Sequence, residues 1–396
     1  MHRTVQYLVV GGGLEGLAIA SALADRGETD VLVVERNTLC SGMTGKSSGV
    51  VRCHYGNASL AAMAWHSLSH FEQAGDRYGD DLGFRQCGYV VGVGANNVAP
   101  LAANVAMQRE LGIEVELIDH DRMAELWPGL YLEDFAAFAY EPRGGRGEAY
   151  LTGMAYAKAA RSHGVAIQQG AAVTALLQRA DGSIYGASMA DGSEIHCETV
   201  ILATGPWAPA LAGQVGVEVP VRALRAQLVM VDPGEPLPVV PVFSDLAGLQ
   251  YLCREPNGEL LAGNSDHTEP EYSDPDHYPN QADDDTIDTI VAKLGLRLPG
   301  MPDPRISGSY GGCYDVTPDY NPIIGPAPMA GLFLATGFSG HGFKISPAVG
   351  RLAADLLTDG HTTLPGVRAE DFRYARFAEG DLLTSPHPYA GASEMR

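Results

Sequence analysis

Hydrophobic residues near the start of the chain form two short continuous runs separated by a segment with helical character. Residues 7–10 (Tyr-Leu-Val-Val) and 31–34 (Val-Leu-Val-Val) have the length and branched composition of buried parallel strands. Between them, residues 17–26 carry mainly small and aliphatic side chains, which suit a helix packed on a sheet. The pattern predicts a strand–helix–strand unit at the N-terminus.

Three glycines follow the first predicted strand at the spacing G-x-G-x-x-G. Gly11 suits the tight turn, Gly13 lets the backbone approach a pyrophosphate, and Gly16 lets helix and strand pack closely. Glu35 lies 19 residues beyond Gly16, where an acidic side chain can bind the ribose hydroxyls of an adenosine. The unit therefore predicts dinucleotide binding, and a glycine-rich turn with a purely structural role is the alternative.

Strand and helix patterns continue along the chain and predict a mixed α/β fold. Apolar residues recur at helical spacing over 58–71, 98–111, 122–127, 152–163 and 283–294. Runs of strand length occupy 86–93, 115–118, 165–168, 173–177, 199–207, 219–231, 249–263 and 332–336. Residues 144–147 (Gly-Gly-Arg-Gly) predict a turn. Alternating runs between proline-rich loops after residue 216 are typical of an antiparallel sheet, which we expect to form the wall of a substrate cavity.

The length of 396 residues exceeds one usual hydrophobic core, so we expect two domains. The fold class predicted is α/β, with a Rossmann-like dinucleotide-binding domain and a discontinuous substrate domain built on an antiparallel sheet. The first domain would comprise 1–85, 145–215 and 310–375, the second 86–144 and 216–309, and the C-terminal tail 376–396. The strand over 199–207 would end against the dinucleotide.

Charge and cysteine content exclude several classes of function. Forty-eight acidic against 26 basic residues give a net charge of -22, which repels nucleic acid and anionic membranes. The six cysteines show no metal-ligand spacing, and we expect reduced thiols in a cytoplasmic protein rather than a disulfide set. The apolar run 5–24 could suggest a signal or membrane helix, but its three consecutive glycines and Glu15 favour the strand–helix–strand unit. His66 and His70 have a spacing that can bind metal, yet no third ligand accompanies them, and we expect no metal site.

A second glycine-rich loop lies near the C-terminus. Residues 337–344 (Gly-Phe-Ser-Gly-His-Gly-Phe-Lys) follow the predicted strand 332–336 and precede a helix expected to reach residue 357. Such a loop supplies backbone N–H groups and a helix dipole to an electron-rich group. The chain holds no second complete G-x-G-x-x-G unit, which predicts that it binds one dinucleotide and argues against a reductase with its own nicotinamide domain.

These motifs together resemble the D-amino-acid oxidase superfamily of FAD-dependent oxidoreductases. The resemblance is carried by 11–16 with Glu35, by 201–207 (Ile-Leu-Ala-Thr-Gly-Pro-Trp) and above all by 337–344, and it covers nearly the whole chain. Within the superfamily the chain is similar to the branch of sarcosine oxidases and dehydrogenases, glycine oxidase and the proline dehydrogenase β subunit. The resemblance implies FAD, with its adenosine end on the first motif and its isoalloxazine ring beneath the antiparallel sheet.

The resemblance also implies which residues bind the cofactor. The residues expected at FAD are Gly11, Gly12, Gly13, Leu14, Glu15, Gly16, Glu35, Arg36, Lys46, Ser47, Ser48, Gly49, Val173, Thr204, Gly205, Trp207, Gly312, Gly337, Phe338, Ser339, Gly340, His341, Gly342, Phe343 and Lys344.

Four residues carry over to the expected reaction site. Arg52, after Val50 and Val51, matches an arginine that holds the substrate carboxylate, and Lys344 matches a lysine that shares it. Tyr251 matches a substrate-facing tyrosine, and His267, followed by Thr268, resembles an active-site His-Thr pair. The alternatives are a flavin-phosphate or salt-bridge role for Arg52, a structural role for Lys344, sheet packing for Tyr251 and a plain loop position for His267.

Two positions depart from the pattern of the branch. Monomeric sarcosine oxidases bind the flavin covalently through a cysteine six residues before the proline of a Thr-Pro-Asp motif, but here Gly312 stands six residues before Pro318 and Cys313 is one residue late. A lysine that activates oxygen near the flavin corresponds here to Leu261. We therefore expect noncovalent FAD, and oxygen is left open as the electron acceptor.

The function implied is oxidation of the C–N bond of a small amino acid, N-methylated or secondary, like sarcosine or proline. Hydride transfer to flavin N5 would give an imine. The alternatives are a dehydrogenase subunit that passes electrons to a partner protein or a quinone, and a hydroxy-acid oxidoreductase of the same fold. The expected partners are thus a small amine or amino acid and, in one alternative, an electron-accepting subunit.

Overall fold

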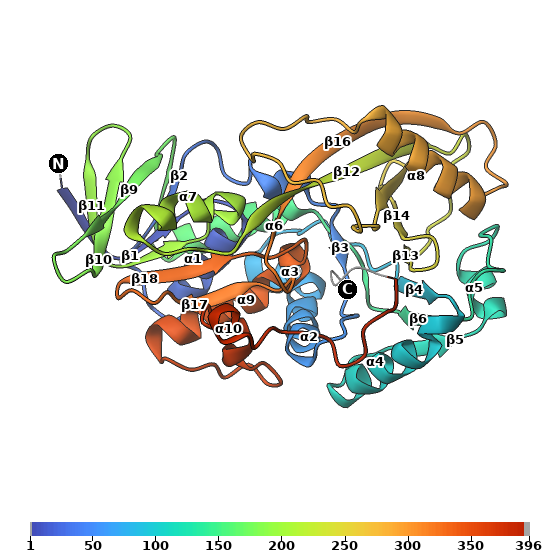
Figure 1. Cartoon of the computed structure of the whole chain (residues 1–396), viewed down its shortest axis with the longest axis horizontal. Helices are drawn as coiled ribbons and strands as arrows, with labels where there is room; N and C mark the ends of the chain where they lie inside the picture. Colours follow the sequence, from blue (N-terminus) through green and yellow to red (C-terminus); the bar gives the residue numbers. More distant parts are fainter. Residues whose placement is uncertain (1, 392–396) are drawn as a thin grey trace.

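Two eight-stranded sheets organise residues 2–391, the part of the chain that the computed structural model describes. Figure 1 shows the first sheet with its helices on the left and the second sheet on the right, with the long strands β12 and β16 reaching between them. Within the described residues no helix combines the length and apolar character needed to cross a membrane. The α/β prediction is confirmed.

Parallel strands form the centre of the first sheet. Its order is β17-β18-β11-β1-β2-β8, in which only β17 runs antiparallel to its neighbour. The strands are β1 (His2–Val10), β2 (Val31–Glu35), β8 (Ala166–Gln169), β11 (Glu194–Leu202), β17 (Ile323–Pro326) and β18 (Leu332–Thr336). A hairpin of β9 (Val173–Gln178) and β10 (Ile184–Met189) extends from β11.

Side chains alternate between the two faces of this sheet, and both faces are buried. Val9, Val33 and Ile201 join the larger hydrophobic cluster, to which α1 contributes Leu17 and Leu23. Strand residues of the opposite parity join a second cluster beneath the β9–β10 hairpin. Burial on both faces explains why β1 and β2 are continuous apolar runs rather than alternating ones. The helices of the larger cluster are α1 (Leu14–Asp25), α2 (Ala58–Glu72), α6 (Ala149–Ser162) and α9 (Gly342–Thr358).

The second sheet is antiparallel except for one pair. Its order is β16-β12-β15-β14-β13-β4-β6-β5, and β13 runs parallel to β4. The strands are β4 (Tyr89–Val93), β5 (Glu116–Ile118), β6 (Ala137–Glu141), β12 (Arg222–Asp232), β13 (Val242–Asp245), β14 (Gln250–Arg254), β15 (Leu260–Asn264) and β16 (Arg305–Val316). The helices α4 (Val98–Glu110), α5 (His120–Leu126) and α8 (Asp284–Arg297) accompany it. The expected antiparallel sheet is thus present.

Several boundaries differ from those expected. Helix α1 begins at Leu14 rather than at residue 17, since the Leu14 N–H is satisfied by Thr44 Oγ1 at 3.0 Å. The strand expected over 199–207 ends at residue 202, because residues 205–207 form a 3₁₀ turn with Pro206 inside it. The run 249–263 is two strands, joined by a turn in which the Glu255 N–H donates to the Glu259 carbonyl.

Several strands were not expected, among them β16 and β17. β6 and β13 lie in the interior of the second sheet, and β7 (Gly145–Arg146) replaces the turn expected over 144–147. β7 pairs with β3 (Val50–Val51) outside both large sheets. This small ribbon fixes the backbone immediately before Arg52.

Strand β16 pairs with β12 along its whole length, including the residues after 310 that we assigned to the first domain. The division of the chain into domains remains a proposal. Short helices complete the structure: α3 (Ala74–Tyr78), α7 (Ala208–Ala212) and α10 (Arg376–Glu379).

Candidate active site

A cavity of about 440 Å³ lies where β1, β2 and β11 reach their carboxyl ends. This edge of a parallel sheet is where the doubly wound α/β folds bind nucleotides. Most of the residues expected at FAD line it: Gly11, Gly13, Leu14, Glu15, Glu35, Arg36, Lys46, Ser47, Ser48, Val173, Thr204, Gly205, Trp207, Gly312, Phe338, Gly340, Gly342 and Phe343. We call it the dinucleotide cavity.

The glycine motif has the close packing that its spacing predicts. A Cβ on Gly16 would lie 2.0 Å from the Gly11 carbonyl oxygen, so only glycine lets α1 pack on the turn. A Cβ on Gly11 would lie 2.4 Å from the Ala203 carbonyl oxygen, and Gly11 has φ +112°. Gly13 meets no backbone atom and faces the cavity, which leaves room for a phosphate beside it.

Glu35 ends β2 and lines the dinucleotide cavity. Its Oε2 accepts the Gly12 N–H at 2.9 Å, and its Oε1 accepts the Asn37 N–H at 2.8 Å. Gly12 therefore positions Glu35 instead of lining the cavity. Both carboxylate oxygens keep lone pairs for the hydroxyls of a ribose.

Arg36 and Trp207 meet at the same cavity. The Arg36 guanidinium lies over the Trp207 ring, 4.4 Å from its centroid, and donates to Asp276 at 2.8 Å. Lys46 also lines the cavity and donates to the Asn280 side chain. The two side chains tie the long loop between β15 and α8 to the segment between β2 and β3.

Three polar side-chain atoms of the cavity wall are buried without a hydrogen-bond partner within the described residues. They are Glu15 Oε2, Thr204 Oγ1 and Trp207 Nε1. Buried polar atoms are rarely left unpaired, so this wall is shaped for a polar ligand. Burial, with the nearby Asp315 charge, raises the pKa of Glu15 well above its usual value. A neutral Glu15 can donate a hydrogen bond toward an anionic ligand. The residues present thus fit FAD.

The second glycine loop, residues 337–344, only partly offers the free backbone N–H groups that we expected. The N–H groups of Gly337 and Ser339 donate to Asp315, at 2.7 Å to Oδ2 and 3.1 Å to the carbonyl oxygen, and the His341 N–H donates to the Phe338 carbonyl. These three N–H groups are used inside the protein, so they are not available to a flavin as we had expected. Phe338, Gly340 and Gly342 line the dinucleotide cavity.

A smaller cavity of about 100 Å³ adjoins the first one. The two share Ser48, Tyr314 and Gly340 in their walls. All four residues expected at the reaction site line the smaller cavity, which we call the reaction cavity: Arg52, Tyr251, His267 and Lys344. Ser339 and His341, expected at FAD, line it as well. Gly16, Gly49 and Gly337 line neither cavity and serve the packing of the backbone.

Arg52 follows the β3–β7 ribbon and enters the reaction cavity between aromatic rings. Its guanidinium lies 4.3 Å from the centroid of Tyr55 and 5.7 Å from that of Tyr89, and it donates to the His54 carbonyl. The Glu141 carboxylate is close enough to Arg52 to favour the charged form of the guanidinium. It accepts a hydrogen bond from the Cys53 N–H at 2.8 Å. Burial raises the pKa of Glu141 to about 7, so this acid is only partly ionised at neutral pH.

Lys344 lies in the first turn of α9 and is 6% exposed. Its ammonium donates to the Gly340 carbonyl at 3.2 Å. Burial, and then the neighbouring Arg52 charge, lowers the pKa of Lys344 well below its usual value. Within residues 2–391, no aspartate or glutamate forms an ion pair with Lys344 or Arg52. The reaction cavity therefore contains two basic side chains without a direct anionic partner among the described residues.

Tyr251 reaches the cavity from β14. Its ring lies over Gly263 of β15, where a Cβ would come within 2.2 Å of the ring, so glycine makes room for it. The hydroxyl is buried beside Ser48 without a well-formed hydrogen bond within the described residues. His267 lies in the loop after β15 and lines the cavity, while Thr268 is exposed and donates to Asp266.

The structure adds residues that the sequence did not indicate. His54, Tyr89, Ser244, Asn264, Tyr314 and Tyr389 all line the reaction cavity. Tyr89 donates to Ser244 at 2.8 Å, and Tyr389 hydrogen-bonds to His54. Only His54 had a local signal, its place two residues after Arg52. The other residues lie on strands and on a C-terminal segment that are far apart in the sequence, so no short motif predicts that they line one cavity.

The two departures have structural counterparts. A Cβ on Gly312 would lie 2.9 Å from Lys46 Cβ, so a cysteine there would require Lys46 to move. Cys313 lines the dinucleotide cavity, and burial raises the pKa of its thiol to about 11. Leu261 is 1% exposed and pairs in the sheet with Met230 and Cys253.

The described residues contain no cluster of three or more His, Cys, Asp or Glu side chains able to hold a metal ion. His66 instead contacts the Pro365 carbonyl and His70 contacts the Tyr78 hydroxyl. All six cysteines are free.

Known proteins resemble the chain over most of its length. The 4-methylaminobutanoate oxidase (formaldehyde-forming) of Paenarthrobacter nicotinovorans is 29% identical over 94% of this chain and 46% of its own length. The sarcosine oxidase subunit beta of Rhizobium meliloti (strain 1021) is 29% identical over 95% of this chain and 89% of its own. The crystal structure of L-proline dehydrogenase from P. horikoshii superposes with a TM-score of 0.88 and 26% identity, covering 96% of this chain and 100% of that one.

The chain spans less than half the length of several relatives, among them 4-methylaminobutanoate oxidase at 46% and the rat dimethylglycine dehydrogenase at 45%. A family model described as DAO, FAD dependent oxidoreductase, matches residues 6–356. The cofactor of this family is FAD, in agreement with the cavity that ends β1, β2 and β11. The chain belongs to the DAO family of FAD-dependent oxidoreductases.

Proposed function

We propose that the chain oxidises the C–N bond of a small amino acid, N-methylated or secondary, to an imine. One observation carries the proposal: Arg52 and Lys344 converge, without an ion-pair partner among the described residues, in a small cavity adjoining the dinucleotide cavity. A buried guanidinium without a counter-charge is costly, and a substrate carboxylate would supply that charge to Arg52 and favour the protonated form of Lys344. The guanidinium offers paired donors and the ammonium a point charge, which together fix a carboxylate.

The walls of the reaction cavity suit a small, partly apolar amine. About 100 Å³ admits only a compact substrate, and Tyr89, Tyr251 and Tyr314 give aromatic surface for a methyl group or a small ring. With the carboxylate fixed by Arg52 and Lys344, the amine end is directed away from these cations. The Tyr251 hydroxyl and the His267 ring are the polar groups placed to accept or hold the amine proton.

FAD, when bound, supplies the acceptor of the hydride from the carbon next to nitrogen, and the imine product is then hydrolysed by water. The protein's part is to bind the carboxylate, to orient the amine and to keep it uncharged. Because Lys344 has a lowered pKa, a bound carboxylate would also stabilise its protonated form.

The names of the relatives support this substrate class. Sarcosine, proline and 4-methylaminobutanoate, which appear in those names, are all secondary amines that carry a carboxylate. A hydroxy acid would satisfy the two cations equally well, so the amine is the part of the proposal that must be tested separately.

Anaerobic reduction of the flavin by a substrate panel tests the proposal. The panel contains N-methyl amino acids, proline, their primary amino acids, the matching hydroxy acids and the decarboxylated amines. We expect bleaching of the flavin absorbance by the N-methyl or secondary amino acids and little by the other classes. Bleaching by hydroxy acids alone, or by decarboxylated amines as fast as by their acids, would contradict it.

A second candidate concerns the electron acceptor: a dehydrogenase whose electrons pass to a partner protein or a quinone rather than to oxygen. The buried Leu261 favours it, since an apolar side chain stands where the resemblance places an oxygen-activating lysine. Rapid mixing of substrate-reduced protein with air-saturated buffer distinguishes the two. Slow reoxidation that a quinone or dye accelerates supports the dehydrogenase, and immediate reoxidation by oxygen refutes it.

A further inference from the structure

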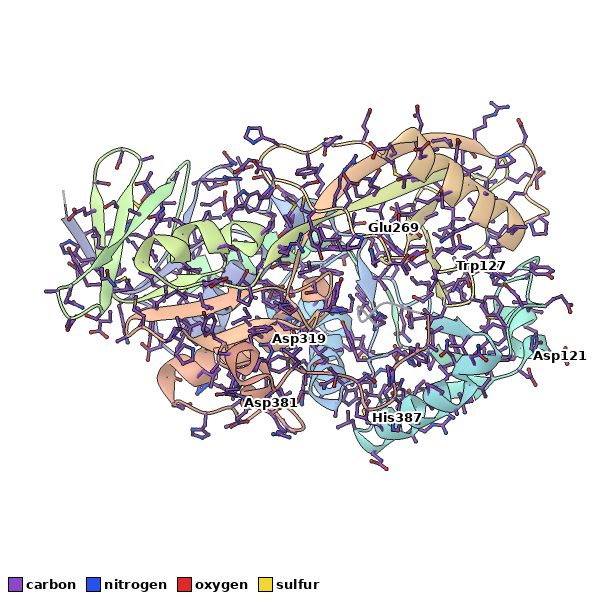
Figure 2. All side chains as sticks on the ribbon, viewed as in Figure 1. Asp121, Trp127, Glu269, Asp319, Asp381 and His387 are labelled. Atoms are coloured by element: carbon purple, nitrogen blue, oxygen red, sulfur yellow. The ribbon has the colours of Figure 1, made fainter. Side chains whose placement is uncertain are left out.

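The last described residues form an irregular segment that crosses from the first domain to the second. Figure 1 shows it leaving α10, passing α2 and α4 and turning back toward the centre of the molecule, and Figure 2 shows Asp381 near its start and His387 farther along, beside α4. We call residues 381–391 the C-terminal strap. Apart from its first residue, which bonds to α10, it is held by side chains of other segments.

The strap is anchored at the loop between β16 and β17. The Leu383 N–H donates to Asp319 Oδ2 at 3.0 Å, and the Asn321 side-chain amide donates to the Leu383 carbonyl at 2.7 Å. Asp319 is itself fixed by the buried Arg376 guanidinium. The beginning of the strap is therefore held by a rigid, buried polar network.

The far end is anchored on the other domain. The Asn104 amide on α4 donates to the His387 carbonyl at 3.1 Å. Asn97, which precedes α4, accepts the Ala390 N–H at 2.7 Å and donates to the Ala390 carbonyl at 3.0 Å. Pro386 and Pro388 restrict the backbone between the anchors and reduce the entropy lost on ordering it. These anchors hold residue 389 in place from both sides.

Tyr389 is the only buried residue of the strap, at 7% exposure, and it lines the reaction cavity. Its hydroxyl lies 2.7 Å from His54 Nε2, and the two rings stack at 6.1 Å between centroids. His54 lines the same cavity, two residues after Arg52. The strap thus places Tyr389 in the wall of the reaction cavity, next to His54 and close to Arg52, the residue proposed to bind the carboxylate.

The contact between the two rings does not depend on pH near neutrality. Burial, and then the positive charge of Arg52, lowers the pKa of His54 to about 3. The imidazole is therefore neutral at working pH, and its Nε2 is hydrogen-bonded to the Tyr389 hydroxyl. The wall made by His54 and Tyr389 is a fixed part of the cavity.

We propose that Tyr389, carried by the C-terminal strap and seated on His54, limits the size of the substrate that the reaction cavity admits. The inference rests on the proposed function, because it says how large that substrate can be. A cavity of about 100 Å³ with a fixed aromatic wall has little room for groups larger than a methyl or a small ring.

A series of N-methyl-, N-ethyl- and N-propylglycine tests the proposal in wild type, Tyr389→Ala and Tyr389→Leu. Wild-type kcat/KM should fall along the series, and Tyr389→Ala should raise the ratio of N-propyl to N-methyl activity by about tenfold or more. Tyr389→Leu, which keeps apolar packing on His54, should give an intermediate ratio and serves if the alanine variant fails to fold. Tyr374→Ala is the matched control, because Tyr374 lies near the same end of the chain, donates to the Glu218 carbonyl and lines neither cavity.

A ratio in both Tyr389 variants equal to that of wild type and Tyr374→Ala would overturn the proposal. A readout without turnover separates this outcome from failure of the proposed function. Acetate, propionate and butyrate are titrated into each holoprotein, and binding is followed by the change in flavin absorbance. If no amine is oxidised but Tyr389→Ala gains affinity selectively for propionate and butyrate, Tyr389 does limit the size of the ligand and the proposed substrate class is wrong. If the three affinities keep their wild-type ratios, Tyr389 does not limit the size of the ligand.

Discussion

At the residue scale, Glu35 shows how one side chain serves both the fold and the cofactor. Its carboxylate is held by the N–H groups of Gly12 and Asn37 and faces the dinucleotide cavity. The backbone bonds fix the side chain before any ligand arrives, so little entropy is lost when ribose hydroxyls bind to it. Glu35 lies at the end of β2, remote in the sequence from the four residues of the reaction cavity.

Glu35→Ala should weaken FAD binding and leave turnover of the fully loaded protein nearly unchanged. Loss of charge-assisted bonds to the ribose should cost about 1.5 to 3 kcal/mol, or roughly 10- to 150-fold in Kd. Titration of the apoprotein with FAD, followed by flavin fluorescence, measures the change, and Glu28→Ala, at a residue that lines neither cavity, is the control. An unchanged FAD affinity would show that Glu35 does not bind the adenosine ribose.

Site residues could be identified from the sequence where they stand in a short motif whose spacing indicates their chemical role. Gly11 and Gly13 of the first motif, Arg52 and Lys344 stand in short motifs, and their side chains or backbone line the two cavities. Tyr89 and Tyr389 had no such signal, because their place in the reaction cavity depends on how distant segments pack. The roles of the site residues stay predictions until they are tested.

At the element scale, α10 and the β16–β17 loop are joined by an ion pair in which both side chains are fully buried. The Arg376 guanidinium donates to Asp319 Oδ2 at 2.7 Å and to Oδ1 at 2.9 Å. Burial tends to raise the pKa of Asp319, but the hydrogen bond and charge of Arg376 outweigh it, and the pKa is lowered. The pair therefore holds α10, and with it the start of the C-terminal strap, on the loop between β16 and β17.

Arg376→Met should destabilise the protein by about 3 to 5 kcal/mol near neutral pH, because it leaves a buried carboxylate without its partner. The pKa of Asp319 is lowered in the fold, so its contribution to stability is present above the unfolded pKa of about 3.9 and is lost as the pH falls through the lower folded value. The gap in urea stability between variant and wild type should thus be wide at neutral pH and narrow on strong acidification. Arg373→Met, which removes the partly exposed ion pairs to Glu379 and Asp381, should change little; an equal loss in both variants would contradict this assignment.

The elements predicted most reliably are those with strong periodicity and a local boundary signal. The first strand–helix–strand unit and β18 agree closely with expectation, since apolar runs end at glycines. β6 and β13 were missed because they are short strands whose pairing partners lie far away in the chain. β7 was read as a turn because its glycines favour one, yet its pairing with β3 makes it a strand.

At the scale of the whole molecule, FAD should lie across the join between the two sheets without a covalent link. Gly312 offers no thiol, and a Cβ there would crowd Lys46. Cys313 keeps its proton because burial raises its pKa to about 11, which makes it a poor nucleophile. The cofactor is then held only by the noncovalent contacts of the dinucleotide cavity.

Acid precipitation of the purified holoprotein tests this arrangement. The yellow colour should remain in the supernatant, and Cys313→Ser should retain as much FAD as wild type before precipitation. Colour in the wild-type pellet that is absent from the Cys313→Ser pellet would show a bond to Cys313. Colour in both pellets would place the link at another residue.

The overall architecture could be predicted from two features of the sequence. The glycine motifs near both ends of the chain belong to the first sheet, and the alternating strands between them belong to the second sheet. The resemblance to FAD-dependent oxidoreductases is confirmed by the match over residues 6–356. The C-terminal strap could not be predicted, because it has no regular structure and its position depends on single hydrogen bonds to Asn97, Asn104 and Asn321.

The most direct test of the central claim is kcat/KM of Arg52→Ala and Lys344→Met for the best carboxylated amine and for its decarboxylated counterpart. Each substitution should lower kcat/KM for the carboxylated amine by roughly 30-fold to several thousand-fold, since losing a buried charged contact costs about 2 to 5 kcal/mol. Preference for the carboxylated amine should shrink in parallel, while FAD content stays near that of wild type and of the exposed control Lys158→Met. If both variants oxidise the carboxylated amine as wild type does and keep its preference, Arg52 and Lys344 do not bind a substrate carboxylate.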